Sequence, residues 1–72
     1  MEGIVTWYRP QRGYGYIYGS DKQDYFVYHD EIQMSGFRKL LVGDRVTFSP
    51  EITEKGLRAR NVKKIENISN IP

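Results

Sequence analysis

The sequence consists largely of short segments rich in β-branched and aromatic residues, which are separated by clusters of turn formers. The segments are GIVTWY from Gly3, YGYIYG from Tyr14, DYFVYH from Asp24, RVTFS from Arg45 and LRARNVKKI from Leu57. Turn formers stand between them at 9–13, 19–21, 43–44 and 50–56. Asp30 is placed to cap a single helical turn through Met34, and no stretch has the period of a long helix. The pattern predicts an all-β fold of five short strands, closed or nearly closed into a small barrel that hides its sheet edges.

The length of 72 residues allows one domain, and a chain of this size buries only ~60% of the surface that it exposes when unfolded. There is no Cys and only one His, so we expect no disulfide and no metal site. No apolar run is long enough to span a membrane, and the N-terminus lacks the pattern of a secretory signal. These features predict a cytoplasmic protein without a membrane partner.

Alternation along the segments separates a core from an outer face. The predicted core comprises Val5, Ile17, Val27, Val46, Phe48, Ala59 and Val62, with help from Ile32 and Leu40. The residues predicted to face outward are Trp7, Tyr14, Tyr16, Phe26 and Tyr28. A small barrel cannot enclose one Trp, six Tyr and three Phe, so part of this aromatic surface must be exposed. A contiguous exposed aromatic patch usually marks a binding site.

The stretch RGYGYIYG, residues 12–19, places Tyr14, Tyr16 and Tyr18 on one side of a strand. Gly13 and Gly15 let this strand curve without crowding the rings. An aromatic surface edged by Arg and Lys suits single-stranded nucleic acid, since unpaired bases stack on the rings and cations meet the phosphates. Tyr18 is either part of this surface or merely exposed.

Charge is nearly balanced, with eleven Lys plus Arg against nine Asp plus Glu, and the net charge of +2 does not single out nucleic acid. Its distribution says more. From Lys55 to Lys64 the chain carries five basic residues and no acidic one, and four further basic residues lie near aromatics in the sequence: Arg9, Arg12, Arg38 and Lys39. Each of these residues, Arg60 included, has solvated surface as the alternative interpretation.

Six segments in this order and spacing resemble the cold-shock domain family, over residues from about Glu2 to Lys64: GIVTWY, RGYGYI, YFVYH, GFRKL, GDRVTF and GLRARNV. The resemblance implies a five-stranded antiparallel barrel of the OB type that binds single-stranded RNA or DNA without cofactor or catalysis. It implies stacking or edge contacts at Trp7, Tyr14, Tyr16, Phe26, Tyr28, His29 and Phe37, with Arg12, Asp24 and Arg58 as polar neighbours. Tyr8 and Arg38 complete the predicted site. Phe37 is either a core plug or a mobile lid over the bases, and the resemblance favours the lid.

We expect residues 1–65 to form the domain and residues 66–72 to form a C-terminal tail. Leu41 and Val42 are an apolar pair in a predicted turn, and the tail, with Ile65, Ile68 and Ile71 three apart, is a candidate to cover them. A homodimer contact and a disordered tail are the alternatives; overall, a monomer is favoured over a dimer.

These features favour a single-stranded nucleic-acid-binding protein that acts as a passive RNA chaperone or as a regulator of transcription or translation. Remodelling would be passive because the chain has no phosphate-binding loop ending in Gly-Lys-Ser/Thr. The alternative is a protein-interaction barrel whose aromatic face docks a peptide or partner subunit. An enzyme is not expected, nor is a small-molecule substrate, since the chain has one His, no Cys and no recognisable pair of catalytic carboxylates.

Overall fold

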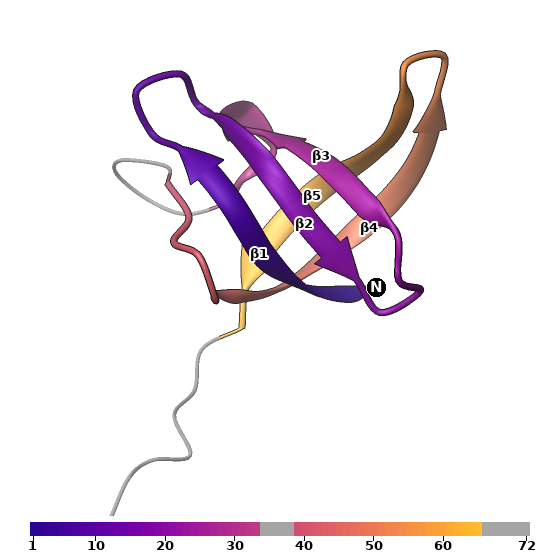
Figure 1. Cartoon of the computed structure of the whole chain (residues 1–72), viewed down its shortest axis with the longest axis horizontal. Coiled ribbons are helices and arrows are strands. Elements are labelled where there is room, and N and C mark those ends of the chain that lie inside the picture. Colours follow the sequence, from indigo (N-terminus) through magenta and orange to yellow (C-terminus); the bar gives the residue numbers. More distant parts are fainter. Residues whose placement is uncertain (34–38, 66–72) are drawn as a thin grey trace, which may run out of the picture.

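The computed structural model of the chain describes residues 1–33 and 39–65. Its elements are β1 (Glu2–Arg9), β2 (Tyr14–Gly19), β3 (Asp24–Tyr28), the 3-10 turn η1 (His29–Glu31), β4 (Arg45–Thr53) and β5 (Gly56–Lys64). The strands close into a barrel in the order β1-β2-β3-β5-β4, and β1, β2 and β3 lie side by side on one face (Figure 1). The predicted five-stranded, all-β barrel with a single helical turn is confirmed. The predicted contacts Phe37 and Arg38 and the predicted tail 66–72 lie outside the described residues.

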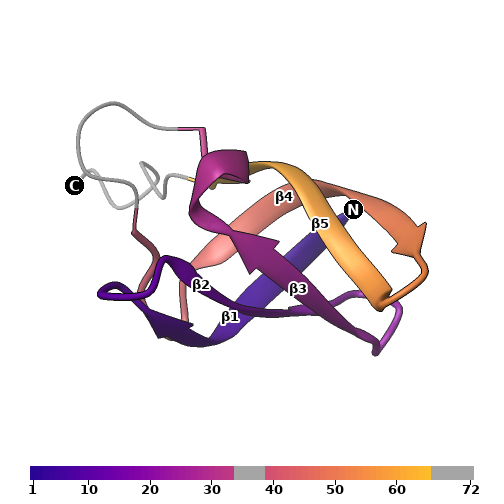
Figure 2. The same ribbon diagram turned by 90° about the horizontal axis from the view of Figure 1, so that it is seen from above.

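Closure joins strands that are far apart in the sequence. The pairs β1–β2, β2–β3, β1–β4 and β4–β5 are antiparallel, whereas β3 and β5 run parallel and meet at Phe26 and Arg58. An isolated parallel bridge between Ile32 and Val62 continues this contact beyond β3. Seen from above, β5 crosses the barrel beside β3 and η1 (Figure 2). The parallel pair positions Arg58 next to the aromatic residues of β3.

All nine residues predicted to form the core are buried: Val5, Ile17, Val27, Ile32, Leu40, Val46, Phe48, Ala59 and Val62. The sequence analysis missed Tyr25, whose ring is 4% exposed and lies 4.9 Å from the ring of Phe48, centroid to centroid. Its hydroxyl donates a hydrogen bond of 2.6 Å to Asp21 Oδ2 at the surface. Tyr25 therefore contributes its ring to the core, while its hydroxyl is hydrogen-bonded to Asp21.

The turn predicted at 50–56 is present but shorter, since it lies between Thr53 and Gly56. β4 continues through Pro50 to Thr53, and Pro50 lies opposite Ala59 of β5. β4 pairs with β1 only as far as Thr47, so at Pro50 it has β5 as its one neighbouring strand, just after a register shift between Thr47 and Ser49. Edges and bulges are the places where a sheet tolerates a residue without an N–H.

The predicted helix cap at Asp30 is also wrong, because Asp30 lies inside η1 and the preceding Tyr28 makes no side-chain capping bond. The turn is held from outside instead. Glu31 accepts hydrogen bonds from Arg60 Nη1 (3.0 Å) and from the backbone N–H of Asn61 (3.1 Å). Asn61 has a φ of 52°, a left-handed conformation in which Asn is enriched.

The hydrogen bond from Tyr25 to Asp21, followed by burial, raises the pKa of Tyr25 above its ordinary value. A raised pKa in the folded state means that the neutral phenol stabilises the fold below the unfolded pKa of about 10, and that this contribution is lost as pH rises through the folded pKa. We therefore expect stability to fall above about pH 10, and to fall less steeply in Tyr25→Phe. Urea unfolding of both proteins between pH 8 and 11 checks this; parallel pH profiles would contradict it.

Candidate nucleic-acid interface

A β-bulge in β1 decides which of its rings face outward. The register of β1 against β2 shifts between Val5 and Trp7. Strict alternation would place Trp7 inside with the buried Val5, but the shift turns Trp7 outward and leaves it 37% exposed. The next residue, Tyr8, consequently packs against the core, and burial raises its pKa. The predicted contact at Tyr8 is thus on the side of the strand away from the exposed rings.

The outward rings are aligned in two rows across the strands. One row places Arg9, Tyr14 and Tyr28 on neighbouring strands, and the next places Trp7, Tyr16 and Phe26. Ring centroids within and between the rows lie 5.5–6.0 Å apart, over the pairs Trp7–Tyr14, Trp7–Tyr16, Tyr14–Phe26, Tyr16–Phe26 and Phe26–Tyr28. We call Trp7, Tyr14, Tyr16, Phe26 and Tyr28 the aromatic face. Phe26 contacts three of the other four rings and is its centre.

Two glycines allow the rings to lie this close. A side chain at Gly15 would collide with the carbonyl oxygen of Trp7 and come within 2.7 Å of the Cα of Tyr8. Gly13 has a φ of 77°, and a Cβ there would lie 2.7 Å from the imidazole of His29. The backbone N–H of His29 donates to Gly13 O at 2.7 Å, so the turn before β2 also fixes His29 beside Tyr28, with ring centroids 5.3 Å apart.

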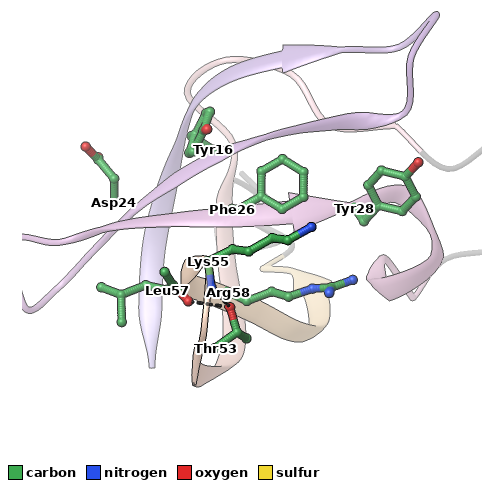
Figure 3. A pocket seen from close by; sticks show the side chains of 9 residues that line it. Tyr16, Asp24, Phe26, Tyr28, Thr53, Lys55, Leu57 and Arg58 are labelled. Atoms are coloured by element: carbon green, nitrogen blue, oxygen red, sulfur yellow. Dashed lines mark hydrogen bonds between the residues drawn. The ribbon is translucent and has the colours of Figure 1, made fainter.

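A hollow of about 640 Å³ lies between the aromatic face and the β4–β5 hairpin. Its lining is Tyr16, Asp24, Phe26, Tyr28, Thr53, Lys55, Gly56, Leu57 and Arg58. Figure 3 shows the side chains of Lys55 and Arg58 running side by side below the ring of Phe26, with their charged ends toward Tyr28. Thr53 Oγ1 donates a hydrogen bond of 2.8 Å to Gly56 O, which closes the hairpin turn that carries Lys55. The hollow therefore combines a ring surface with two cations and one carboxylate.

Arg58 has a donor with no partner. Its Nε is buried, and no atom of residues 1–33 or 39–65 accepts a hydrogen bond from it. Buried donors of this kind are rare, because leaving one unmade costs about 1–3 kcal/mol.

The basic residues near this face form no ion pair in the described structure, whereas three basic residues elsewhere do. Arg60 is held by Glu51 (2.7 Å) and Glu31 (3.0 Å), and the Glu51 hydrogen bond is the main cause of its raised pKa. Arg45 pairs with Glu2, and Lys64 pairs with Asp44. No such ion pair within the described part of the chain engages Arg9, Arg12, Lys55 or Arg58. The cations around the aromatic face are therefore available to a ligand.

The structure thus brings together most of the predicted site: Trp7, Tyr14, Tyr16, Asp24, Phe26, Tyr28, His29 and Arg58. Arg12 lies in the loop between β1 and β2 and donates its backbone N–H to Arg9 O at 3.1 Å. Two further basic residues beside this face, Arg9 and Lys55, were noted in the sequence but left out of the predicted site. Arg9 places its guanidinium 5.3 Å from the ring centroid of Trp7, and its spacing of two from Trp7 on one strand was the available signal. Lys55 gave no such signal, because only the barrel closure brings its hairpin beside β3.

Within the ranges that the structure describes, no group of three or more His, Cys, Asp or Glu side chains could hold a metal ion. The same ranges contain no helix that is long and apolar enough to cross a membrane.

Comparison with known proteins agrees with this geometry. The family model described as 'Cold-shock' DNA-binding domain matches residues 1–65. Cold shock protein 1 of Lactiplantibacillus plantarum is 43% identical over 60 residues, which is 83% of this chain and 91% of the relative. The major cold shock protein of Micrococcus luteus is 42% identical over 64 residues, 88% of this chain and 96% of the relative.

Among solved structures, drosophila Unr CSD456 superposes with a TM-score of 0.74 at 23% identity, covering 94% of this chain and 27% of that one. At this identity the likeness concerns the fold alone. The match of the family model over residues 1–65, together with relatives above 40% identity along most of the chain, shows that the chain belongs to the cold-shock domain family.

Proposed function

We propose that the protein binds single-stranded RNA or DNA by stacking unpaired bases on the aromatic face. The observation that carries this proposal is the coincidence of five contacting outward rings with cations that have no ion pair in the described structure. Aromatic side chains stack with any base at about 1–3 kcal/mol per base, and Lys or Arg beside them meets the phosphates.

The proposed activity is stoichiometric capture of unpaired strands, without catalysis or cofactor. Capture shifts an equilibrium between paired and unpaired nucleic acid by mass action, which is the action of a passive RNA chaperone. The same capture on a transcript would regulate transcription or translation. We place this activity in the domain of residues 1–65 and, as predicted from the sequence, in the cytoplasm.

Fluorescence of Trp7 tests the proposal directly, since it is the single Trp of the chain and lies within the aromatic face. Titration with oligothymidine and with oligouridine should quench this fluorescence saturably, and comparing the two ranks DNA against RNA. Absence of quenching with either strand at about 100 μM, the weak end of non-specific affinities, would contradict the proposal. The face would then serve another ligand, such as a peptide.

The salt dependence of this binding should report the contact made by Lys55. Neutralising phosphates releases counterions, so the logarithm of affinity falls with the logarithm of salt by about 0.7 per contact on single strands. We expect Lys55→Gln to make this slope shallower by about 0.7. Lys63→Gln is the matched control, because Lys63 lines a different hollow with Thr47 and Ser49. Equal slopes for Lys55→Gln and the unaltered protein would exclude the phosphate contact.

A further inference from the structure

The rows of the aromatic face are followed by a third row at the other end of β2. Tyr18 lies two residues beyond Tyr16 and therefore on the same outer side of the strand, about 7 Å further along it. Its neighbours across the strands are Ile4 of β1 and Asp24 of β3. Tyr18 is 43% exposed and Ile4 is 47% exposed, close to the 41% of Tyr16. The third row thus continues the second with one ring, Tyr18, and has Ile4 in the position of Trp7 and Asp24 in the position of Phe26.

This row has a hollow of its own, separate from the hollow beside Phe26. It measures about 320 Å³ and is lined by Glu2, Gly3, Ile4, Tyr18, Gly19, Ser20, Lys22 and Arg45. Asp24 lines the larger hollow and is the strand neighbour of Tyr18, so the two hollows adjoin at this pair. The surface available to a bound strand does not end at Tyr16.

The charges at this second hollow suit a phosphate. Arg45 is the neighbour of Ile4 on β4, and Lys22 stands in the turn after β2 with a φ of 67°. Glu2 is the one carboxylate in the lining, and Arg45 Nη2 pairs with it at 3.2 Å, with both side chains more than half exposed. Such an exposed pair is worth at most about 1 kcal/mol, so Arg45 can turn to a phosphate at small cost. Lys22 forms no ion pair in the described structure.

We propose that Tyr18 and Ile4 form an additional nucleotide subsite, in which one further unpaired base of the same bound strand stacks on Tyr18 and its phosphate meets Lys22 or Arg45. The inference rests on the proposed function and extends it. Continuity with the aromatic face selects this occupant, because a strand lying over Tyr16 and Phe26 reaches Tyr18 in one step along β2. The subsite lengthens the binding site by one nucleotide.

The test compares oligothymidines of two to eight nucleotides on the unaltered protein, Tyr18→Ser and Tyr18→Phe, with Trp7 fluorescence as the readout. Affinity rises with length until every subsite is filled. For Tyr18→Ser we expect this rise to stop one nucleotide earlier, and affinity for the longest strands to fall roughly 5- to 150-fold, the worth of one stacked base. Affinity for the shortest strands should not change, because these occupy the aromatic face. Tyr18→Phe keeps the ring and should bind like the unaltered protein.

Ile52→Ser is the control for removal of an exposed apolar side chain, since Ile52 is 84% exposed and lines neither hollow. It should leave the length profile unchanged. An unchanged profile in Tyr18→Ser would overturn the subsite while leaving the proposed function intact. Equal weakening at every length would also overturn it, because that result indicates a change in the barrel rather than the loss of one subsite. Absence of binding by the unaltered protein would instead refute the proposed function.

Discussion

Replacing Phe26 by Ala should weaken binding of oligothymidine and oligouridine by on the order of 100-fold, the largest loss expected for any single ring. Phe26 is the centre of the aromatic face, with the rings of Tyr14, Tyr16 and Tyr28 all within 6.0 Å. Its truncation removes one stacking surface and leaves those three rings without a common neighbour. The loss should therefore approach the upper end of the range for one stacked base, about 3 kcal/mol. Titration of Trp7 fluorescence in each variant measures it.

Two controls separate the loss of a ring from other effects. Phe26→Tyr keeps the ring and should bind within a few-fold of the unaltered protein. Leu57→Ala removes a half-buried apolar side chain from the same hollow without removing a ring, and should lose clearly less affinity. A thermal melt of each variant shows whether the barrel remains folded at the titration temperature. Equal losses for Phe26→Ala and Leu57→Ala in folded proteins would argue against stacking as the source of affinity.

Replacing Gly15 by Ala should destabilise the barrel by about 3 kcal/mol or more, which is a large part of the total stability of a domain of this size. The added methyl group would collide with the carbonyl oxygen of Trp7 and lie 2.7 Å from the Cα of Tyr8, both of them backbone atoms of β1. A backbone in a sheet cannot move aside as the end of a side chain does, so β1 and β2 would have to separate. Urea denaturation measures the change in the free energy of unfolding.

Gly56→Ala is the matched control for this substitution. Gly56 has a φ of 124°, which strains any other residue, but a Cβ there would meet no atom within 4 Å. We expect a cost of about 1–3 kcal/mol from the backbone conformation alone. A loss at Gly15 no greater than the loss at Gly56 would show that the two strands can accommodate a methyl group, and would contradict the close approach.

Simple alternation was sufficient to predict the core and most of the outer face. Residues such as Ile17 and Val27 lie in strands where buried and exposed residues alternate regularly. In such a strand, once one side is identified as the core, the side of every other residue follows.

In β1 the rule does not hold, because alternation counted from the buried Val5 would place Trp7 inside and Tyr8 outside. A bulge between Val5 and Trp7 reverses both, and the sequence carries no local mark of it. The outward position predicted for Trp7 is therefore correct, whereas Tyr8 lies on the other side of the strand. A different rule, that turn formers end a strand, failed at Pro50, because the Pro is tolerated in a strand that has one neighbour at that point.

Prediction of the charged part of the site was weaker, because it depends on partners that are distant in the sequence. The basic residues of the fifth segment are alike in sequence, yet the structure gives them different surroundings. Arg60 is bound by Glu31 and Glu51, from η1 and β4, whereas Arg58 enters the hollow beside Phe26. The surroundings of Arg58 differ from those of Arg60 because β5 pairs with β3 at Arg58. The spacing of residues within the segment does not indicate this pairing.

Because of the bulge in β1, the number of residues in this strand decides which ring faces the ligand and which faces the core. The types of residue in the strand do not decide it. A substitution between Val5 and Tyr8 alters one contact, but an insertion or deletion there would exchange the sides of Trp7 and Tyr8 together. The indole would then compete for space inside a barrel that is already filled, while the exposed face lost its outermost ring. In this segment, changes in residue count are therefore constrained jointly by folding and by recognition, whereas changes in residue type are constrained by only one of them at a time.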